Sequence, residues 1–495
     1  MLLTLRIVHL NDSHSMLDRA GQVKTVIDTA RQVDPGCLFL VAGDALVGTP
    51  WYDVGGKGAL DFQVLEAMQP DAYVIGNHDL DGGIHNFLCV LQTLQIPLTV
   101  ANWQIQGPLA ELVNPYVIKT VQGKKVAIIG LSIDPCAYGL PLDAGIAYRV
   151  PAMALQDLLP MLKKIEKPDA IIVLSHLGAS TDEELAGYFP EVAAFVGGHS
   201  HTAIPFPERY THPNHSVTVV VQAGCKNEYV GLLEVDIIGG KVVNGTRGGL
   251  IRITEDIPAD PEITAMLSPY QQAMAPYDAV IGKAAENIPL WVEDSPDKPM
   301  GNLVAGWIRE VTSQMLGQSI DLAILNQTGF RRGLAEGAIT KRDVYEAYPF
   351  DNGLMVTTLR GIQVQAMLDH LATRGGDPIS GITLTLAGDH ATDVRIGGQP
   401  LLLDKAYRVA SNSYLIKSGG SGYTVLSQGA DTVDTQWTIR GVIEAAVAAT
   451  PVIEKPKDAQ ARIQQPAFQL AEEISMRWGI GDVQPLQATC PCGRP

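Results

Sequence analysis

The sequence predicts an α/β domain followed by a second domain of the α+β class, and three observations predict this organisation. Short runs of β-branched residues alternate with helix-compatible stretches from residue 3 to about residue 255. Polar residues gather where these runs end, as they do in open α/β folds that carry their sites at the carboxyl ends of strands. A chain of 495 residues also exceeds one ordinary core, which favours two to four domains.

Eight strands are predicted in the first domain, residues 1–255. They cover residues 3–10, 37–43, 72–77, 97–102, 125–132, 170–176, 193–201 and 217–224. Residues 256–298 begin with a proline-punctuated segment and continue as a long helix-compatible run. This stretch is therefore predicted to be a helical connector.

The second domain, residues 299–450, is predicted to mix helices and strands. Helices are expected at 301–316 and 341–348, and strands at 321–326, 354–361, 381–388, 391–398 and 405–415. Residues 451–495 form a predicted extension rich in Pro, Gln and Ala, with one amphipathic run at 468–480 that either packs against the body or is disordered. Cys490 and Cys492 fall in this extension and are interpreted as part of a solvated tail.

Composition narrows the classes of partner. Lys and Arg number 36 against 53 Asp and Glu, a net charge of −17, so polymeric nucleic acid is not an expected partner. Small anions remain possible substrates, because a metal ion or clustered arginines can reverse the local field. No apolar run approaches the ~20 residues that span a bilayer, so no membrane partner is expected.

The amino terminus and the cysteines bear on location. The chain enters a strand pattern directly, without the charged and apolar regions of a signal peptide. As written it is expected to be cytoplasmic, or periplasmic or secreted if a signal has been removed. The six cysteines are sparse and scattered, which does not indicate a disulfide framework.

Possible metal ligands cluster at the predicted strand ends. These ends carry Asp12, His14, Asp44, Asn77, His78, Asp81, His176, His199 and His201. Oxygen and imidazole groups without a thiolate suit Mn²⁺, Fe²⁺, Co²⁺ or Zn²⁺ better than a structural zinc site of the Cys type. In an extended segment residues i and i+2 point the same way, so Asp12 and His14 can face one ion, as can His199 and His201.

Each motif alone also has an ordinary explanation. A single D-x-H is more often a surface pair, G-N-H-D can be a capped turn, and His176 can be a hydrogen-bonded core histidine. Five such motifs, each ending a predicted strand, are far better explained by a metal site. The series D-x-H, G-D, G-N-H-D, H and G-H-x-H resembles the calcineurin-like metallophosphoesterases. Its fuller context, "IVHLNDSH", "AGDALVGTP", "DAYVIGNHDLD", "SHLGASTDEELA" and "VGGHSHT", resembles their 5′-nucleotidase branch over residues 3–255.

The resemblance implies a four-layer αββα sandwich and two metal ions. It assigns Asp12, His14 and His201 to one ion and Asn77, His176 and His199 to the other, with Asp44 bridging the pair. His78 would then act on the phosphoryl group as the catalytic histidine, oriented by Asp81. Asp79 would belong to the loop itself.

The second domain resembles the 5′-nucleotidase carboxyl-terminal domain through "MGNLVAGWI", "NQTGFRRGL", "AYPFDNGLM" and "RVASNSYLIKSGGSGY". The resemblance implies that two aromatic rings sandwich the base and that Asn and Arg groups contact the nucleotide. Carried over by motif, these substrate-binding residues are Phe350, Tyr414, Asn326 and Arg331, with Arg332 as an adjacent possibility. Without the metal motifs beside them, the two aromatic residues would be interpreted as core residues.

Two departures from the family pattern concern the substrate. Ser421 stands in "GGSG" where the family usually has an aspartate that contacts the ribose hydroxyls, and one extra residue separates Tyr414 from these glycines. Only Lys298 precedes "MGNL", where an arginine is usual. The prediction is thus a phosphohydrolase with two divalent ions, acting on nucleoside 5′-phosphates or related monoesters. The alternatives are a cyclic-nucleotide phosphodiesterase, a nucleotide-sugar pyrophosphatase, or a non-catalytic nucleotide-binding protein.

Overall fold

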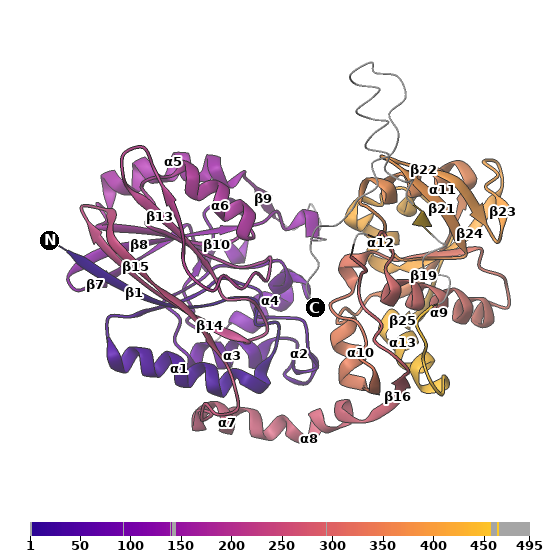
Figure 1. Cartoon of the computed structure of the whole chain (residues 1–495), viewed down its shortest axis with the longest axis horizontal. Coiled ribbons are helices and arrows are strands. Elements are labelled where there is room, and N and C mark those ends of the chain that lie inside the picture. Colours follow the sequence, from indigo (N-terminus) through magenta and orange to yellow (C-terminus); the bar gives the residue numbers. More distant parts are fainter. Residues whose placement is uncertain are drawn as a thin grey trace, which may run out of the picture.

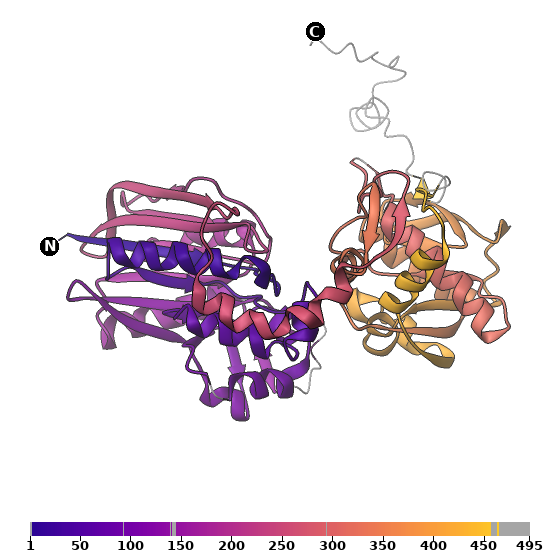
Figure 2. The same ribbon diagram turned by 90° about the horizontal axis from the view of Figure 1, so that it is seen from below.

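The computed structural model describes residues 2–92, 94–138, 140, 145–293, 295–456 and 463–464. It contains two separate bodies of α and β structure, the first built from the amino-terminal half of the chain and the second from the remainder (Figure 1). A segment containing α7 (Pro261–Leu267) and α8 (Gln271–Met274) runs from one body to the other, and Figure 2, which views the molecule from below, shows it passing from the first body to the second. None of the described helices is long and apolar enough to cross a membrane.

The first body contains two large mixed sheets. The seven-stranded sheet has the order β15-β14-β1-β2-β3-β4-β6, and the six-stranded sheet has the order β12-β13-β11-β10-β8-β7. The strands of the first sheet are β1 (Leu3–Leu10), β2 (Leu38–Val41), β3 (Ala72–Tyr73), β4 (Leu98–Thr99), β6 (Val113–Asn114), β14 (Tyr229–Ile238) and β15 (Lys241–Arg252). Those of the second are β7 (Tyr116–Val121), β8 (Lys124–Ser132), β10 (Ala170–His176), β11 (Ala194–Gly197), β12 (Glu208–Thr211) and β13 (Val217–Gln222).

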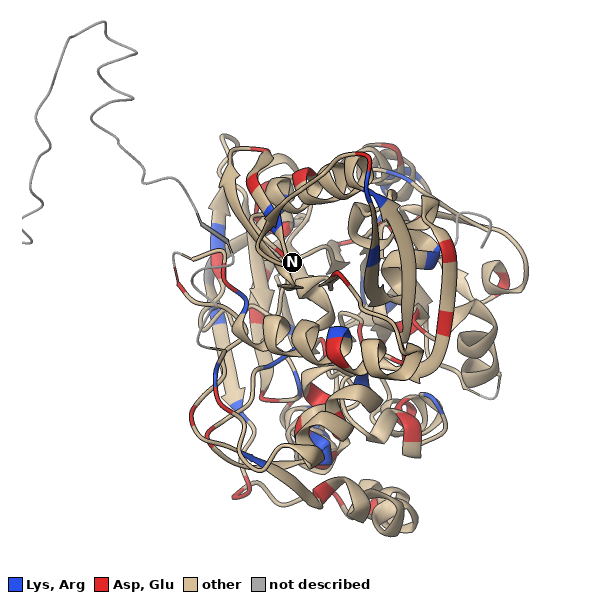
Figure 3. Cartoon of the chain, turned by 90° about the vertical axis from the view of Figure 1, so that its right-hand side faces the viewer, with Lys and Arg blue, Asp and Glu red and all other residues tan. Residues whose placement is uncertain are grey.

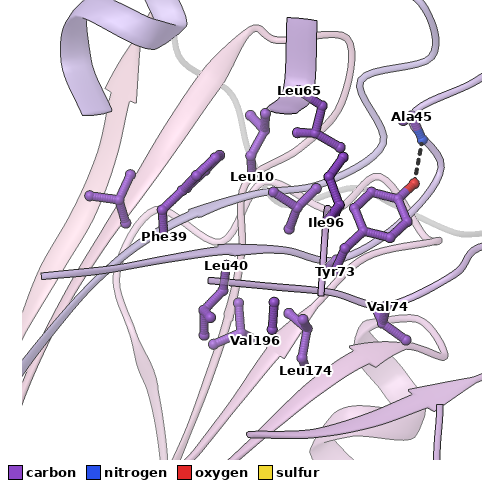
Figure 4. Packing of buried hydrophobic residues seen from close by; sticks show 14 of the residues in the cluster. Leu10, Phe39, Leu40, Ala45, Leu65, Tyr73, Val74, Ile96, Leu174 and Val196 are labelled. Atoms are coloured by element: carbon purple, nitrogen blue, oxygen red, sulfur yellow. Dashed lines mark hydrogen bonds between the residues drawn. The ribbon is translucent and has the colours of Figure 1, made fainter. Parts of the chain in front are cut away.

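The two sheets pack face to face around one apolar core. Leu40 of the first sheet belongs to the same buried cluster as Leu174 and Val196 of the second, and Figure 4 shows these side chains together. Successive residues of a strand face opposite sides, so Ile172 joins this shared core while Val173 joins a separate cluster on the outer face.

Helices cover the outer face of each sheet. The first sheet carries α1 (Ala20–Val33), α3 (Ala59–Ala67) and α4 (Gly83–Leu91), and the second carries α5 (Pro151–Ile165) and α6 (Ala179–Tyr188) (Figure 1). The resulting order is helix, sheet, sheet, helix. This confirms the predicted four-layer αββα sandwich.

The strand directions place the candidate ligands at one edge. β1, β2 and β3 are neighbouring parallel strands, and so are β8, β10, β11 and β13. The carboxyl ends of parallel strands meet at one edge of a sheet, so the segments that follow β1, β2, β3, β10 and β11 converge there. All of the predicted metal ligands lie on those ends.

The second body is of the α+β class. Its main sheet has the order β20-β17-β24-β19-β25, and a smaller one has the order β23-β22-β21-β26. The main strands are β17 (Leu322–Ile324), β19 (Gly353–Arg360), β20 (Ile379–Ser380), β24 (Ala406–Asn412) and β25 (Ala430–Thr438), and the smaller sheet contains β21 (Ile382–Ala387), β22 (His390–Ile396), β23 (Gln399–Pro400) and β26 (Ile463–Gln464). Its helices are α9 (Pro299–Leu316), α10 (Lys341–Ala347), α11 (Gly361–Thr373), α12 (Ser413–Ser418) and α13 (Ile439–Ala449).

Two predicted elements differ from the structure. The strand expected at 405–415 ends at Asn412, whose side chain accepts a hydrogen bond from the Leu415 backbone N–H at 2.9 Å and so begins helix α12. The helix-compatible stretch within 256–298 gives way to strand β16 (Val280–Ala284), which pairs with β18 (Gly337–Thr340). The amphipathic run predicted at 468–480, with Cys490 and Cys492, lies outside the described residues.

The acidic balance of the chain is distributed over both bodies. Figure 3 shows Lys and Arg scattered among Asp and Glu along the ribbon. Several of these charges pair across the two bodies: Lys57 Nζ lies 2.7 Å from Asp351 Oδ2, and Arg342 Nη1 lies 3.0 Å from Asp18 Oδ2. These ion pairs join the two bodies, and the Lys57–Asp351 pair lies at the candidate site, whose wall includes both residues.

Candidate metal centre and substrate cavity

Six of the predicted ligands form two clusters at the sheet edge. Asp12, His14 and His201 place one ligand atom each within 4.8 Å of one another, and so do Asp44, His176 and His199. The outermost members of each cluster, Asp12 and His201 in one and Asp44 and His199 in the other, are more than 150 positions apart in the sequence, and the parallel strands bring them together.

The first cluster points its ligand atoms at a common point. His14 Nδ1 lies 2.9 Å from the Val47 carbonyl oxygen, and because a carbonyl only accepts, this nitrogen carries the proton. The unprotonated Nε2 of His14 then faces His201 Nε2 at 2.9 Å, with Asp12 Oδ1 3.4 Å from that same His201 nitrogen. A backbone carbonyl that fixes the tautomer in this way is the usual outer partner of a metal-binding histidine.

The second cluster repeats the arrangement. His176 Nδ1 donates to the Ala42 carbonyl at 2.7 Å, which leaves His176 Nε2 facing Asp44 Oδ2 at 3.1 Å. His199 Nδ1 lies 3.1 Å from Asn77 Oδ1, so the predicted amide ligand joins this cluster. The other oxygen of Asp44 accepts the backbone N–H of His78 at 2.8 Å.

The residues present fit a pair of divalent cations. Asp12 Oδ1 and His176 Nε2 are fully buried, and their contacts with His201 and Asp44 lack hydrogen-bond geometry, so neither atom is satisfied within the described part of the chain. Buried polar atoms without partners are costly, and a cation held between the ligand atoms would satisfy both. The donors are carboxylate, amide and imidazole groups, which suit borderline divalent metals.

Protonation of the cluster follows from burial and neighbouring charge. Burial lowers the pKa of His14 to about 3, and burial together with the charge of His176 lowers that of His199 to about 4. Both imidazoles are therefore neutral near pH 7, the form that binds metals. Burial opposes the charged form of His176, but the Asp44 carboxylate outweighs it and raises the pKa of His176 to about 9.

The backbone at the ligands lies in an uncommon conformation. Asp12, His14, Asp44, His199 and His201 all have positive φ angles, between 49° and 75°. Non-glycine residues with such angles cost on the order of 1–3 kcal/mol each and cluster at functional sites. Gly76 is required beside them, because a Cβ there would lie 2.1 Å from Asp44 Oδ1.

Asp79 supports the loops that carry the ligands, as the sequence indicates. Its Oδ1 accepts the Ala45 backbone N–H at 3.0 Å, and its Oδ2 accepts the Tyr73 hydroxyl at 2.7 Å and the Gly76 N–H at 2.8 Å. Tyr73 in turn accepts from the Ala45 N–H, the contact drawn in Figure 4. Burial and the charge of Asp44 raise the pKa of Asp79 to about 7.

His78 stands outside both clusters and pairs with Asp81. The two are joined by a hydrogen bond of 2.6 Å between His78 Nδ1 and Asp81 Oδ2. On the other side of the ring, His78 Nε2 lies 2.6 Å from Arg331 Nη2, a residue of the second body. The dyad expected from the sequence is therefore present as a pair and is completed by an arginine from across the site.

A cavity of about 970 Å³ opens between the two bodies at this point. Its walls include Asp44, Asn77, His78, His199 and His201 from the first body and all four predicted substrate residues, Asn326, Arg331, Phe350 and Tyr414, from the second. The Arg331 guanidinium lies 5.2 Å from the Phe350 ring centroid, and the Phe350 and His78 rings are 5.7 Å apart. The metal clusters and the predicted substrate residues thus share one space.

The alternative Arg332 does not enter this cavity. Its guanidinium pairs with Asp343 at 3.0 Å and with Glu346 at 2.8 Å, both on α10. Adjacent side chains leave an extended segment in opposite directions, so only Arg331 faces His78. Lys298 also does not line the cavity, whereas Ser421 does.

Tyr138, Arg374 and Lys57 are among the cavity residues that the sequence motifs did not indicate. Tyr138 places its hydroxyl 3.0 Å from His199 Nε2, and Arg374 and Lys57 line the wall. None of them lies in a recognisable motif or at the end of a predicted strand. Their positions depend on loop and helix packing, so no local signal could have found them.

The four-layer fold and its paired ligand clusters define the class of metallophosphoesterases, which are metal-dependent phosphoester hydrolases. Two family models agree: the calcineurin-like phosphoesterase model matches residues 5–203, and the 5′-nucleotidase, C-terminal domain model matches residues 280–428. The chain belongs to the 5′-nucleotidase family, which joins these two domains.

Known relatives span nearly the whole chain. The 5′-nucleotidase of Vibrio cholerae is 27% identical over 523 residues, covering 92% of this chain and 92% of that protein. The trifunctional nucleotide phosphoesterase protein YfkN of Bacillus subtilis is 26% identical over 483 residues, covering 86% of this chain and 32% of that longer protein. The solved 5′-nucleotidase precursor from Thermus thermophilus is 27% identical with a TM-score of 0.85, covering 94% of this chain and 100% of that one.

Proposed function

We propose that this protein releases phosphate from nucleoside 5′-phosphates or related phosphate monoesters with the help of two divalent metal ions. The observation that carries the proposal is the single cavity that brings both ligand clusters, the His78–Asp81 pair and the predicted nucleotide-binding residues together. One ion would be held by Asp12, His14 and His201, and the other by Asn77, His176 and His199, with Asp44 between them.

The metal ions would supply an activated water nucleophile and neutralise the charge on the phosphoryl oxygens. Asp44 suits the bridging role because its carboxylate is 1% exposed, lies 3.1 Å from His176 Nε2 in its own cluster, and its charge acts on Asp12 and His14 of the other cluster. A shared carboxylate reduces the repulsion between two dications held close together. The metals are expected from among Mn, Zn, Fe and Co, and their identity stays open.

His78 would act on the phosphoryl group from the cavity wall, without binding either metal ion. Its Nδ1–H donates to Asp81, so the reactive nitrogen is Nε2, which lies 2.6 Å from Arg331 Nη2 and accepts its hydrogen bond, because a guanidinium only donates. A phosphate group that displaces this contact would accept from Arg331 and leave Nε2 open to a proton. A proton held on Nε2 can then stabilise the transition state or pass to the leaving oxygen, a role worth roughly 10²–10⁴-fold in rate.

The second body would bind the nucleoside. Phe350 and Tyr414 supply two aromatic faces on the cavity wall, and aromatic faces grip a planar base with little demand on its identity. The Arg331 guanidinium lies over Phe350, which places a cation between the base site and the metal centre. Asn326 adds an amide to the same wall.

The size of the cavity keeps a second function in view. A volume of about 970 Å³ reaches the upper end of the ~300–1,000 Å³ typical of small-molecule sites, so a diester such as a nucleotide sugar or a cyclic nucleotide also fits. A non-catalytic nucleotide-binding protein would use the same cavity. The products distinguish monoester hydrolysis, diester cleavage and nucleotide binding without catalysis.

The test is a substrate panel with separate detection of inorganic phosphate and nucleoside. Purified protein loaded with Mn²⁺, Zn²⁺, Co²⁺ or Fe²⁺ would be given nucleoside 5′-monophosphates, p-nitrophenyl phosphate, cyclic nucleotides and a nucleotide sugar. Phosphate release from the monoesters is expected. Cleavage of the diesters alone would favour a phosphodiesterase or a pyrophosphatase, and nucleotide binding without any hydrolysis would contradict the enzyme assignment.

A further inference from the structure

Two residues of the second body, Arg374 and Ser421, line the cavity and have no part in the proposed reaction. Both are connected to Tyr414, which lines the same wall. The Ser421 backbone N–H donates to the Tyr414 hydroxyl at 3.2 Å, and Arg374 Nη1 donates to the Ser421 carbonyl at 3.4 Å. Arg374 and Ser421 therefore stand directly beside the proposed base-binding tyrosine.

Arg374 is held in place from behind. Its Nε donates to Asp377 Oδ2 at 2.6 Å, and Asp377 is only 1% exposed. Asp377 is itself fixed, because it accepts the Tyr423 hydroxyl at 2.7 Å and the Gln327 backbone N–H at 2.7 Å. The guanidinium is thus anchored at its Nε edge, while its side chain keeps 26% of its surface exposed.

The anchored guanidinium has donors left over. A guanidinium carries five N–H groups, and the described residues that contact the Arg374 guanidinium are Asp377, the Ser421 carbonyl and Tyr423, which do not use all five. Because Arg374 lines the cavity, its remaining N–H groups can donate to a substrate there. A preorganised, partly desolvated guanidinium of this kind favours a bidentate contact with a phosphate or carboxylate.

The other charges of the cavity do not neutralise this position. Three carboxylates line the cavity, and each already pairs with a base elsewhere. Asp44 faces His176, Asp81 faces His78, and Asp351 faces Lys57. None of these three acids contacts Arg374, whose only described acidic partner is the buried Asp377 behind it. The guanidinium can therefore donate hydrogen bonds to a substrate in the cavity.

We infer that Arg374, with the Ser421 hydroxyl beside it, forms a subsite for a second phosphoryl group on the substrate. The inference rests on the proposed function and refines it: the preferred substrate is a nucleotide with one phosphoryl group at the metal centre and another on its sugar. The size of the cavity, about 970 Å³, leaves room for the added group. A fixed guanidinium there selects for charge as well as shape.

The experiment compares adenosine 5′-monophosphate with adenosine 3′,5′-bisphosphate under steady-state conditions in metal-loaded protein. The KM for the bisphosphate is expected to be about tenfold lower, equivalent to ~1.4 kcal/mol of binding free energy. Arg374→Gln should abolish this ratio, and Arg374→Lys should restore part of it. Arg395→Gln, an exposed arginine on β22, is the matched control and should leave the ratio unchanged.

A second variant avoids disturbing the Arg374–Asp377 pair. Ser421→Asp places a carboxylate beside the guanidinium, at a backbone position with φ 53° that aspartate tolerates. This variant should raise the KM for the bisphosphate about tenfold while the thermal unfolding temperature stays near that of the wild type. Calorimetric binding of the bisphosphate should weaken in parallel.

The outcomes are distinct. If the wild type hydrolyses the monophosphate but shows no preference for the bisphosphate, or if Arg374→Gln and Arg395→Gln alter the ratio equally, the subsite is refuted and the proposed function stands. If the wild type hydrolyses neither nucleotide nor p-nitrophenyl phosphate, the proposed function itself fails. A lost ratio in both Arg374→Gln and Ser421→Asp supports the subsite.

Discussion

Arg331 Nη2 lies 2.6 Å from His78 Nε2, so the proposed catalytic histidine of the first body is in direct contact with an arginine of the second. His78 is held on its other side by Asp81 at 2.6 Å. The ring is therefore fixed between an acid of its own loop and a cation from across the cavity. The reactive position of the protein exists only when the two bodies are together.

His78→Asn is expected to lower kcat by roughly 10²–10⁴-fold and to leave both metal ions in place. The histidine belongs to neither ligand cluster, so its loss removes a proton donor without removing a ligand. Elemental analysis of metal content alongside kcat for p-nitrophenyl phosphate checks this. Loss of metal in the variant would instead make His78 a ligand.

Asp44→Asn should lower metal occupancy and activity together. The carboxylate is buried in the second cluster and is the proposed bridge to the first, and an amide cannot offset the charge of two cations. Metal content by elemental analysis is expected to fall below two ions per chain. Asp53→Asn, which changes an acid of the ion pairs between the two bodies, is the control and should keep both ions. Two retained ions in Asp44→Asn would refute the bridge.

Tyr414→Ala should raise KM for nucleotides about tenfold or more, with a smaller change for p-nitrophenyl phosphate. The tyrosine lines the cavity and offers a ring face to the nucleobase, and p-nitrophenyl phosphate has no nucleobase. Michaelis–Menten parameters for both substrates decide the matter. Equal losses for the two would mean that Tyr414 supports the fold around Gly420, against which its ring packs.

Asp61→Asn should stabilise the protein at pH 8 and have little effect near pH 4. Burial raises the pKa of Asp61 from its ordinary 3.8 to about 7. The folded state therefore holds this proton more tightly than the unfolded state does. Stability fully present below pH 3.8 is lost as the pH rises to about 7, by at most ~1.4 kcal/mol per pH unit.

The measurement for Asp61 is the Tm of wild type and variant at several pH values with metal concentration held constant. The asparagine removes the charge while keeping the size of the side chain. The Tm difference should grow between pH 4 and pH 7 and then level off. A difference independent of pH would show that the carboxylate is not the group that titrates.

The ligand motifs were readable because each lies on consecutive residues at a strand end. The β-branched runs before "LNDSH" and "GGHSH" marked β1 and β11 correctly. Asp12 and His14 share one cluster as their spacing predicts, but the expectation that His199 and His201 face one ion is wrong, because both have positive φ angles and they join different clusters. The four-layer fold and the family also followed from this text. The role expected for Asp79 in "GNHDLD", support of the loop, differed from that of its polar neighbours, and the structure shows Asp79 bound to the loop backbone.

Other features could not be read locally. The strand expected to run through Tyr414 stops at Asn412, because that side chain caps a helix and local capping overrides β propensity. Arg331 and Arg332 are adjacent and chemically equal, and only the position of α10 shows that Arg332 pairs with Asp343 and Glu346. Tyr138 and Arg374 lie in no motif at all.

By itself, the sequence determined the layers, the order of the strands along the chain and the residues able to bind metal, because periodicity and ligand chemistry are properties of short segments. The tertiary structure decided which of the adjacent Arg331 and Arg332 contacts His78, and it brought Arg374 to the cavity wall. These depend on contacts between residues as far apart as His78 and Arg331, whose separation of 253 positions is closed only by packing the two bodies together.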